Sequence, residues 1–254
     1  MTARRLVQLV ADYGPGDLAF AEMAQLLELV VPDAEVRLTR VPARDTLAAG
    51  WCAASLALCE GPPGRLVVVD VTASDGARHC VGRARDGVEI VGPNCGWTWS
   101  FLAAEVCGPC YLEVPARDGL VRTPWLLAQA VVRVAKRQPH GVREPVPHEE
   151  IPVVPDSVVA FVDCDGSLET TVPHAADTVG RQMEVRIGDV TATAFVTDGS
   201  PPPGEVALAL RPADSTRGGD RAFSALTVRG GSAAELFGSP PGGAPVVIGG
   251  PARA

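Results

Sequence analysis

The pattern of apolar and polar positions at the start of the chain predicts a strand, a turn and a helix. Leu6–Ala11 is an apolar run, Asp12–Asp17 is an acidic turn with two glycines, and apolar residues then recur at helical spacing as far as Val31. In open α/β sheets such a turn lies outside the carboxyl end of its strand, where ligands bind. A strand-to-helix turn with Asp17 as an N-cap explains the same pattern without a ligand.

Strands and helices continue to alternate as far as residue 137. The pattern predicts strands at Ala34–Thr39, Arg65–Val71, Cys80–Arg83, Val88–Val91 and Tyr111–Val114, and helices at Thr46–Leu58, Trp97–Val106 and Pro124–Lys136. Within Arg65–Val71 only Arg65 and Asp70 are polar, which is typical of a strand buried on both faces. The fold class predicted for this half is an α/β domain with a mainly parallel sheet.

The pattern changes after a proline-rich segment. Gln138–Pro155 carries five prolines and is typical of a linker. Short strands separated by Gly, Pro and Asp turns follow it, at Val158–Asp163, Ser167–Val172, Gln182–Ile187, Thr191–Val196, Glu205–Leu210 and Phe223–Val228. The sequence therefore predicts an α/β domain over 1–137, a linker over 138–156, an all-β barrel-like domain over 157–238 and a flexible tail over 239–254.

Composition narrows the class of protein. The chain has 254 residues, of which 46% are hydrophobic and 20% charged, so a sizeable core is available. A net charge of −8 with scattered arginines argues against nucleic acid and anionic membranes as partners. No apolar run approaches the ~20 residues of a membrane span, and the first residues lack a signal-peptide core. We expect a soluble, cytoplasmic protein.

Cysteine and histidine spacing gives no metal site. Seven irregularly spaced cysteines are expected to be free thiols, and the four histidines add no zinc spacing. Cys107-Gly-Pro-Cys110 has the spelling of a redox motif, which requires its first cysteine at a helix N-terminus. The strand pattern of Tyr111–Val114 directly after it argues against that function.

Several motifs together resemble those of the S-adenosylmethionine (SAM) hydroxide adenosyltransferases and their relatives, the fluorinases and chlorinases. That family has Thr-Asp-Phe/Leu-Gly after its first strand, where this chain has Ala11-Asp12-Tyr13-Gly14. The remaining matches follow in the family's order, at Pro62-Pro63-Gly64, Val69-Asp70, Gly92–Gly96, Val162–Thr171 and Gly231–Gly238. The resemblance implies the two-domain fold and a homotrimer with active sites between the N-domain of one subunit and the C-domain of its neighbour.

The resemblance also implies a site. In this family water or a halide attacks the ribose C5′ of SAM and methionine leaves, so the protein mainly positions and desolvates the reactants. By resemblance Asp12 would hold the ribose hydroxyls, while Asp163 and Ala233 would contact the methionine and adenine ends. Asp70 matches the aspartate that handles the attacking water, and Arg78 lies one residue beyond the position of the family's arginine.

Departures from the family gather at the reacting centre. Leu126 stands at the position of the family's histidine, and Leu127 stands where the family has Gly or Ser. Ser167 replaces the asparagine that reads adenine, and Asp45 replaces an aromatic residue near the ribose. Each hydrogen bond to the ligand that is lost costs ~1–3 kcal/mol of binding free energy. These replacements together would therefore remove most of the recognition of adenosine.

Apolar side chains are expected near the same cleft, namely Trp51, Trp97, Trp99, Trp125, Leu126 and Leu127. They predict a pocket for a bulky apolar molecule that Asp12, Asp70, Arg78 and Asn94 orient, with Tyr13 also in contact. Packing in the core or at the trimer interface explains at least two of the four tryptophans without a substrate. The first hypothesis is a cofactor-independent enzyme of bacterial specialised metabolism, a pericyclic [4+2] cyclase. The second is a SAM-cleaving enzyme that yields adenosine or a 5′-haloadenosine plus L-methionine, with SAM as substrate. The third is a non-catalytic binding trimer.

Overall fold

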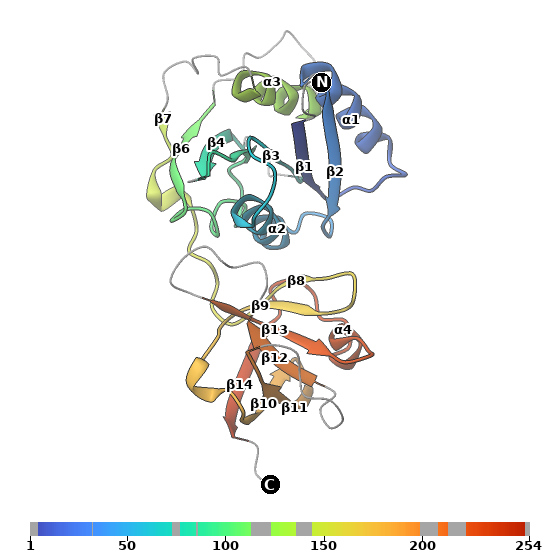
Figure 1. The fold of residues 1–254 in the computed structure, drawn as a ribbon, viewed down its shortest axis with the longest axis vertical. Coiled ribbons are helices and arrows are strands. Elements are labelled where there is room, and N and C mark those ends of the chain that lie inside the picture. The colour runs from blue at the N-terminus through green and yellow to red at the C-terminus, as the bar shows by residue number, and fades with distance from the viewer. Residues whose placement is uncertain are drawn as a thin grey trace. The chain divides into compact units, whose positions relative to one another are not determined.

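The chain folds into two compact units, Met1–Val153 and Val154–Ala254 (Figure 1). The computed structural model describes residues 5–31, 33–72, 77–84, 86–112, 123–135, 144–198, 208–212 and 222–251. The first unit combines helices with a sheet and the second is built mainly of strands, which confirms the predicted α/β-plus-β architecture. Among the described residues no helix has the length and apolar character needed to span a bilayer.

The first unit is built on a seven-stranded sheet of order β2-β1-β3-β5-β4-β6-β7. Its strands are β1 (Arg5–Ala11), β2 (Ala34–Arg40), β3 (Leu66–Asp70), β4 (His79–Ala84), β5 (Glu89–Pro93), β6 (Val106–Tyr111) and β7 (Glu144–Pro145). The pairs among β2, β1, β3 and β5 are parallel, whereas β4, β6 and β7 add antiparallel pairs. The sheet is therefore mixed, which corrects the prediction of a mainly parallel sheet. The tight turn at Gly87 (φ 79°) joins β4 to β5, and a connection that short forces them to be antiparallel.

Three helices cover the two faces of this sheet. Helix α1 (Leu18–Val30) and helix α3 (Thr123–Ala135) pack against each other and share one core cluster with the central strands. Helix α2 (Thr46–Leu58) packs on β1, β3 and β5. The chain steps along the sheet in one direction from β1 to β2 and in the opposite direction from β2 to β3. Because crossovers between parallel strands are right-handed, the two connecting helices, α1 and α2, lie on opposite faces of the sheet. Every residue of β3 is consequently buried.

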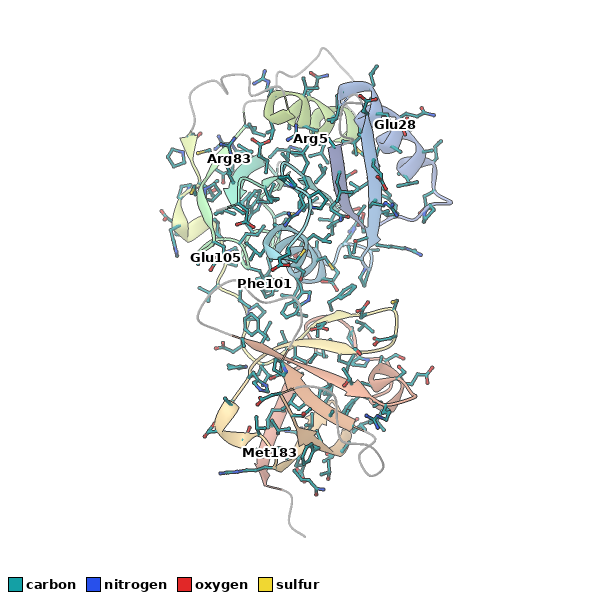
Figure 2. All side chains as sticks on the ribbon, viewed as in Figure 1. Arg5, Glu28, Arg83, Phe101, Glu105 and Met183 are labelled. Carbon is teal, nitrogen blue, oxygen red and sulfur yellow. The ribbon has the colours of Figure 1, made fainter. Side chains whose placement is uncertain are left out.

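The segment after β5 differs from its prediction. Trp97–Val106 is expected to be helical, but residues 97–105 form successive tight turns with i to i+3 backbone bonds, as from Leu102 N–H to the Trp99 carbonyl (3.0 Å). The indole Nε1–H of buried Trp99 donates to the Pro93 carbonyl at 3.1 Å. That tertiary bond holds the segment against the end of β5. Figure 2 labels Phe101 and Glu105 on it.

The second unit holds a seven-stranded sheet of order β14-β10-β11-β12-β13-β9-β8. Its strands and helix are β8 (Val159–Val162), β9 (Leu168–Pro173), β10 (Gln182–Ile187), β11 (Val190–Val196), β12 (Leu208–Pro212), β13 (Phe223–Val228), α4 (Ala233–Leu236) and β14 (Val246–Pro251). It also contains the short 3-10 turn η2 (Ala176–Thr178), whereas the 3-10 turn η1 (His148–Glu150) belongs to the first unit. All strand pairs except β11–β12 are antiparallel. Val159 N–H donates to the Ala244 carbonyl (2.9 Å), so the two outermost strands are joined near their starts.

Two predicted irregular segments are ordered. The sequence predicts a flexible tail from residue 239, but Val246–Pro251 pairs with β10 and buries Val246 beside Ile187. Likewise residues 144–150, expected in the linker, form β7 and η1, and β7 pairs with β6 of the first sheet. Both segments gain their order from pairing with distant strands.

Candidate functional site

Three parallel strands end at one edge of the first sheet, and acidic or polar residues follow each of them. Strand β1 leads into Asp12 and Tyr13, β3 ends at Asp70, and β5 leads into Asn94 and Cys95. The chain leaves β1 toward β2 on one side and reaches β3 on the other. Such a point, where the strand order reverses, is where open α/β sheets bind ligands.

The carboxylate of Asp12 is held by the backbone of two loops. Its Oδ2 accepts hydrogen bonds from Arg44 N–H (2.9 Å), before α2, and from Thr72 N–H (3.1 Å), after β3. Arg44 adopts a left-handed φ of 60°, a strained backbone that is typical of functional loops. Within the described residues Oδ1 has no hydrogen bond, so this oxygen of the fixed carboxylate can still accept one.

Tyr13 and Asp70 form a close pair beside Asp12. The Tyr13 hydroxyl donates to Asp70 Oδ2 at 2.5 Å, and Asp70 is buried at the end of β3. Burial raises the pKa of Asp70; the hydrogen bond from Tyr13 lowers it and the charge of Asp12 raises it further. Burial, followed by the charge and hydrogen bond of Asp70, raises the pKa of Tyr13 far above its ordinary value. Three acidic groups thus share one edge of the sheet.

The turn that carries Asp12 and Tyr13 is closed by Asp17. Its carboxylate accepts from Gly14 N–H at 2.5 Å, and its carbonyl accepts from Phe20 N–H at 3.1 Å. Asp17 occupies the N-cap position of α1, but its side chain caps the preceding turn and makes no bond to the helix. The N-cap explanation is right for the position of Asp17 and wrong for its carboxylate.

Asn94 connects this edge to a polar network at the other end of the sheet. Its Nδ2 donates to the Tyr111 hydroxyl at 2.9 Å, and that hydroxyl donates to Glu150. Asn94 N–H also donates to the Arg78 carbonyl at 2.8 Å. The neighbouring Cys95 is buried, which raises the pKa of its thiol. Asn94 is therefore positioned by Tyr111 of β6 and by the Arg78 carbonyl, directly before β4.

The structure does not bring Arg78 to Asp70. The Arg78 guanidinium lies 3.5 Å from the centroid of the Tyr111 ring and binds Glu144 at 2.5 Å. Asp70 instead has the Tyr13 hydroxyl as its hydrogen-bond partner. Asp70 and Arg78, which the resemblance implies would position the attacking water, are therefore bonded to different residues. Tyr111, Glu144 and Glu150 carried no motif signal in the sequence.

The predicted apolar residues fall into three groups. Trp51 is buried and packs edge-on against Phe101, with ring centroids 5.4 Å apart, and Leu127 is fully buried in the cluster under α1 and α3. Trp97 has 37% of its surface exposed. The side chains of Trp125 and Leu126, in the first turn of α3, lie outside the described residues. Trp51 and Leu127 therefore belong to the core of the first unit, while substrate contact by these residues stays a prediction.

In the second unit the backbone brings together the segments of Asp163, Ser167 and Ala233. The β8–β9 turn is closed by Asp163 N–H to the Ser167 carbonyl (2.9 Å), and Ala234 N–H donates to the Gly166 carbonyl (2.8 Å). Asp163 is exposed, whereas Ser167 and Ala233 are buried. The segments lie side by side, and Asp163 is the one of the three that offers a side chain to solvent.

Comparisons with known proteins bear on the fold alone. No family model matches the sequence, and no curated protein matches it. The chain is similar to the structure of an uncharacterized conserved protein from Thermotoga maritima, with a TM-score of 0.76, 16% identity and coverage of 96% of this chain and 100% of that one. It is also similar to a conserved hypothetical protein from Thermus thermophilus, with a TM-score of 0.68, 24% identity and coverage of 96% and 99%. The whole fold, with both units, therefore occurs in these proteins as well.

Proposed function

We propose that this chain is a strongly diverged member of the SAM hydroxide adenosyltransferase and halogenase fold that acts without SAM on a bulky apolar small molecule, and that its reaction is a pericyclic cyclisation. The observation that carries the proposal is the pairing of Asp70 with Tyr13 while Arg78 binds Glu144. This pairing leaves neither residue of the family's water-handling set arranged for hydrolysis.

The remaining polar groups suit a reaction that needs hydrogen bonds and shape. A pericyclic closure has no leaving group and requires no external nucleophile, so the protein contributes by holding the reacting ends together and by donating to a developing charge. Tyr13 supplies a hydroxyl that is hydrogen-bonded to the buried carboxyl group of Asp70, and Asp12 supplies a fixed acceptor. No resident cofactor is required for this chemistry.

A cyclisation gives a product with the same molecular mass as its substrate, and the experiment uses this property. Deletion of the gene in the source organism is expected to make an acyclic compound accumulate, with the mass of the missing product and a different retention time. The purified protein is then expected to convert that compound into the product. A precursor that accumulates but is bound without conversion would instead support the non-catalytic trimer, and no accumulated isomer would refute the cyclase.

A second candidate, cleavage of SAM, is favoured by the geometry of Asp12. A carboxylate with one oxygen fixed and the other free suits the vicinal hydroxyls of a ribose. Calorimetry with SAM and with adenosine separates the two functions. Micromolar binding together with release of L-methionine would overturn the cyclase proposal.

The proposal includes a homotrimer in the cytoplasm. Light scattering on the eluting protein is expected to give three times the 26.4 kDa mass of the chain. A monomer that retains the conversion would remove the trimer from the proposal and leave the chemistry intact.

A further inference from the structure

Tyr13 gives this site a hydroxyl that the motif it resembles lacks. The family pattern has Phe or Leu at this position, and Tyr13 is one of two tyrosines in the chain. Its ring packs on the core cluster of the first unit, which orients the hydroxyl toward Asp70. The ring alone would serve packing, so the hydroxyl calls for a separate explanation.

We propose that Tyr13 and Asp70 share a proton and act together as the hydrogen-bond donor that this site presents to a carbonyl oxygen of a neutral substrate. With Asp70 ionised, the phenol donates to the carboxylate at 2.5 Å and its proton is occupied. With Asp70 protonated, the carboxyl O–H donates to the phenol oxygen, and the phenolic proton is free for the substrate. No covalent bond forms, and the proton stays with the pair when the product leaves. This inference rests on the proposed function.

The surroundings of the pair favour its protonated form. Burial raises the pKa of Asp70; the hydrogen bond from Tyr13 lowers it and the charge of Asp12 raises it, and the net direction is upward. Of the other titratable groups nearby, Asp17 closes the turn at Gly14 and the Arg40 side chain passes within 3.6 Å of the position of a Cβ on Gly14. Cys95, whose thiol is held neutral by burial, follows β5.

The same groups define the class of substrate. Asp12 lies beside the pair, so an anionic substrate would be repelled, whereas a neutral carbonyl accepts the donated proton without that penalty. A neutral molecule with one carbonyl oxygen fits this feature.

The small number of tyrosines allows a direct test without the substrate. Labelling the full chain with ζ-¹³C tyrosine gives two NMR signals, because the chain contains only Tyr13 and Tyr111. Tyr111→Phe leaves the Tyr13 signal alone and assigns it even if Tyr13→Phe does not fold. The signal is followed across pH in the wild type, in Asp70→Asn and in Asp189→Asn, a control at an exposed turn of the second unit.

The expected result is a Tyr13 signal that shifts as Asp70 ionises and that does not become a tyrosinate near the ordinary phenol pKa. Asp70→Asn is expected to abolish the step due to Asp70, whereas Asp189→Asn retains it. A step that persists in Asp70→Asn, or a Tyr13 signal that titrates like a free phenol, would overturn the shared proton. Because no substrate is present, either result is independent of whether the protein is a cyclase.

Turnover of the accumulated acyclic compound tests the donor role. Tyr13→Phe is expected to lower kcat about 100-fold with little change in KM, the usual effect of removing one donor to a developing oxyanion. In the wild type, kcat is expected to fall as pH rises through the ionisation of Asp70, and Asp70→Asn is expected to lose this dependence. An unchanged kcat in Tyr13→Phe would refute the donor role even if the cyclisation itself is confirmed.

Discussion

The Arg78 guanidinium stacks on the ring of Tyr111 at 3.5 Å from its centroid, at the end of the sheet opposite to β2. The same guanidinium binds Glu144 through two hydrogen bonds of 2.5 and 3.2 Å. The stacking and the paired bonds fix the plane of the guanidinium. Arg78, directly before β4, therefore joins this strand to β6 and β7, a structural contact that does not involve Asp70.

Substitution of Arg78 discriminates between the two enzymatic functions. Under the cyclase proposal Arg78→Ala is expected to retain most of the turnover, because the donor pair is Tyr13 and Asp70. The midpoint of thermal unfolding is expected to change by no more than ~2 °C, since Arg78 and Glu144 are largely solvent-exposed and such pairs stabilise little. Conversion of the acyclic compound and release of methionine from SAM are the two assays. Loss of methionine release in Arg78→Ala would point to SAM cleavage.

Removal of the charge of Asp70 is expected to stabilise the first unit at neutral and alkaline pH. The folded state raises the pKa of Asp70 above its unfolded value, chiefly through burial. The unfolded chain therefore releases this proton first as pH rises, and stability falls until the folded carboxyl has also ionised. Asp70→Asn removes that loss, so its free energy of unfolding at pH 8 is expected to exceed that of the wild type.

Urea unfolding at a series of pH values measures this difference. All four tryptophans, at positions 51, 97, 99 and 125, lie within the first unit, so their fluorescence reports its unfolding. The gap between Asp70→Asn and the wild type is expected to narrow toward acid pH, where both states of the wild type hold the proton. A gap that is independent of pH would show that the Asp70 pKa is not raised by folding.

Local patterns in the sequence predict the strands well where alternation is bounded by turns. Gln182–Ile187 and Phe223–Val228 are predicted with the bounds that β10 and β13 have. Strand β14 is missed because Val246–Pro251 contains two glycines and a proline and owes its extension to pairing with β10. The turns after Trp97 mimic helical periodicity, and a tertiary bond from Trp99 decides their geometry.

The candidate site is predictable to the extent that it lies at strand ends. Asp12 and Asp70 follow or end apolar runs in the sequence, and parallel pairing of β1 with β3 places them together. The pairing of Tyr13 with Asp70 and the position of Arg78 depend on side-chain directions that no spacing encodes. Glu144 and Glu150 approach from a proline-rich segment far along the chain, which the sequence predicts as linker.

Gly96 is expected to be irreplaceable at the contact between the β5 loop and α2. It has φ 47°, and a Cβ on it would lie 2.2 Å from Thr46 Oγ1, which itself accepts from Trp97 N–H. Gly96→Ala is expected to lower the free energy of unfolding by ~2–5 kcal/mol through backbone strain and overpacking. Gly87→Ala is the matched control, because Gly87 has φ 79° and open space around its Cα, so only the strain of ~1–2 kcal/mol applies. Equal effects in urea unfolding would show that the contact with Thr46 is unimportant.

Arg65 stabilises the first unit by capping the C-terminal end of α2. Its buried guanidinium donates to the carbonyls of Leu56 (3.1 Å), Ala57 (3.1 Å), Cys59 and Pro62 (3.4 Å). These carbonyls lack helical donors, so a planar cation with several N–H groups satisfies them together. Arg65→Met is expected to lower the free energy of unfolding by ~2–4 kcal/mol, since buried acceptors lose bonds to a charged donor.

Comparing Arg65→Lys with Arg65→Met tests how the guanidinium of Arg65 caps the helix. Arg65→Lys keeps the charge but has one nitrogen for carbonyls spread over a whole turn, so its stability is expected to fall between the wild type and Arg65→Met. Arg37→Met is the control, because Arg37 is exposed and, among the described residues, pairs with Glu35 alone on the edge strand β2. It is expected to change stability by less than ~0.5 kcal/mol. Tryptophan-detected urea unfolding compares the three variants. An Arg65→Met protein as stable as Arg37→Met would mean that water satisfies these carbonyls and that the cap contributes little.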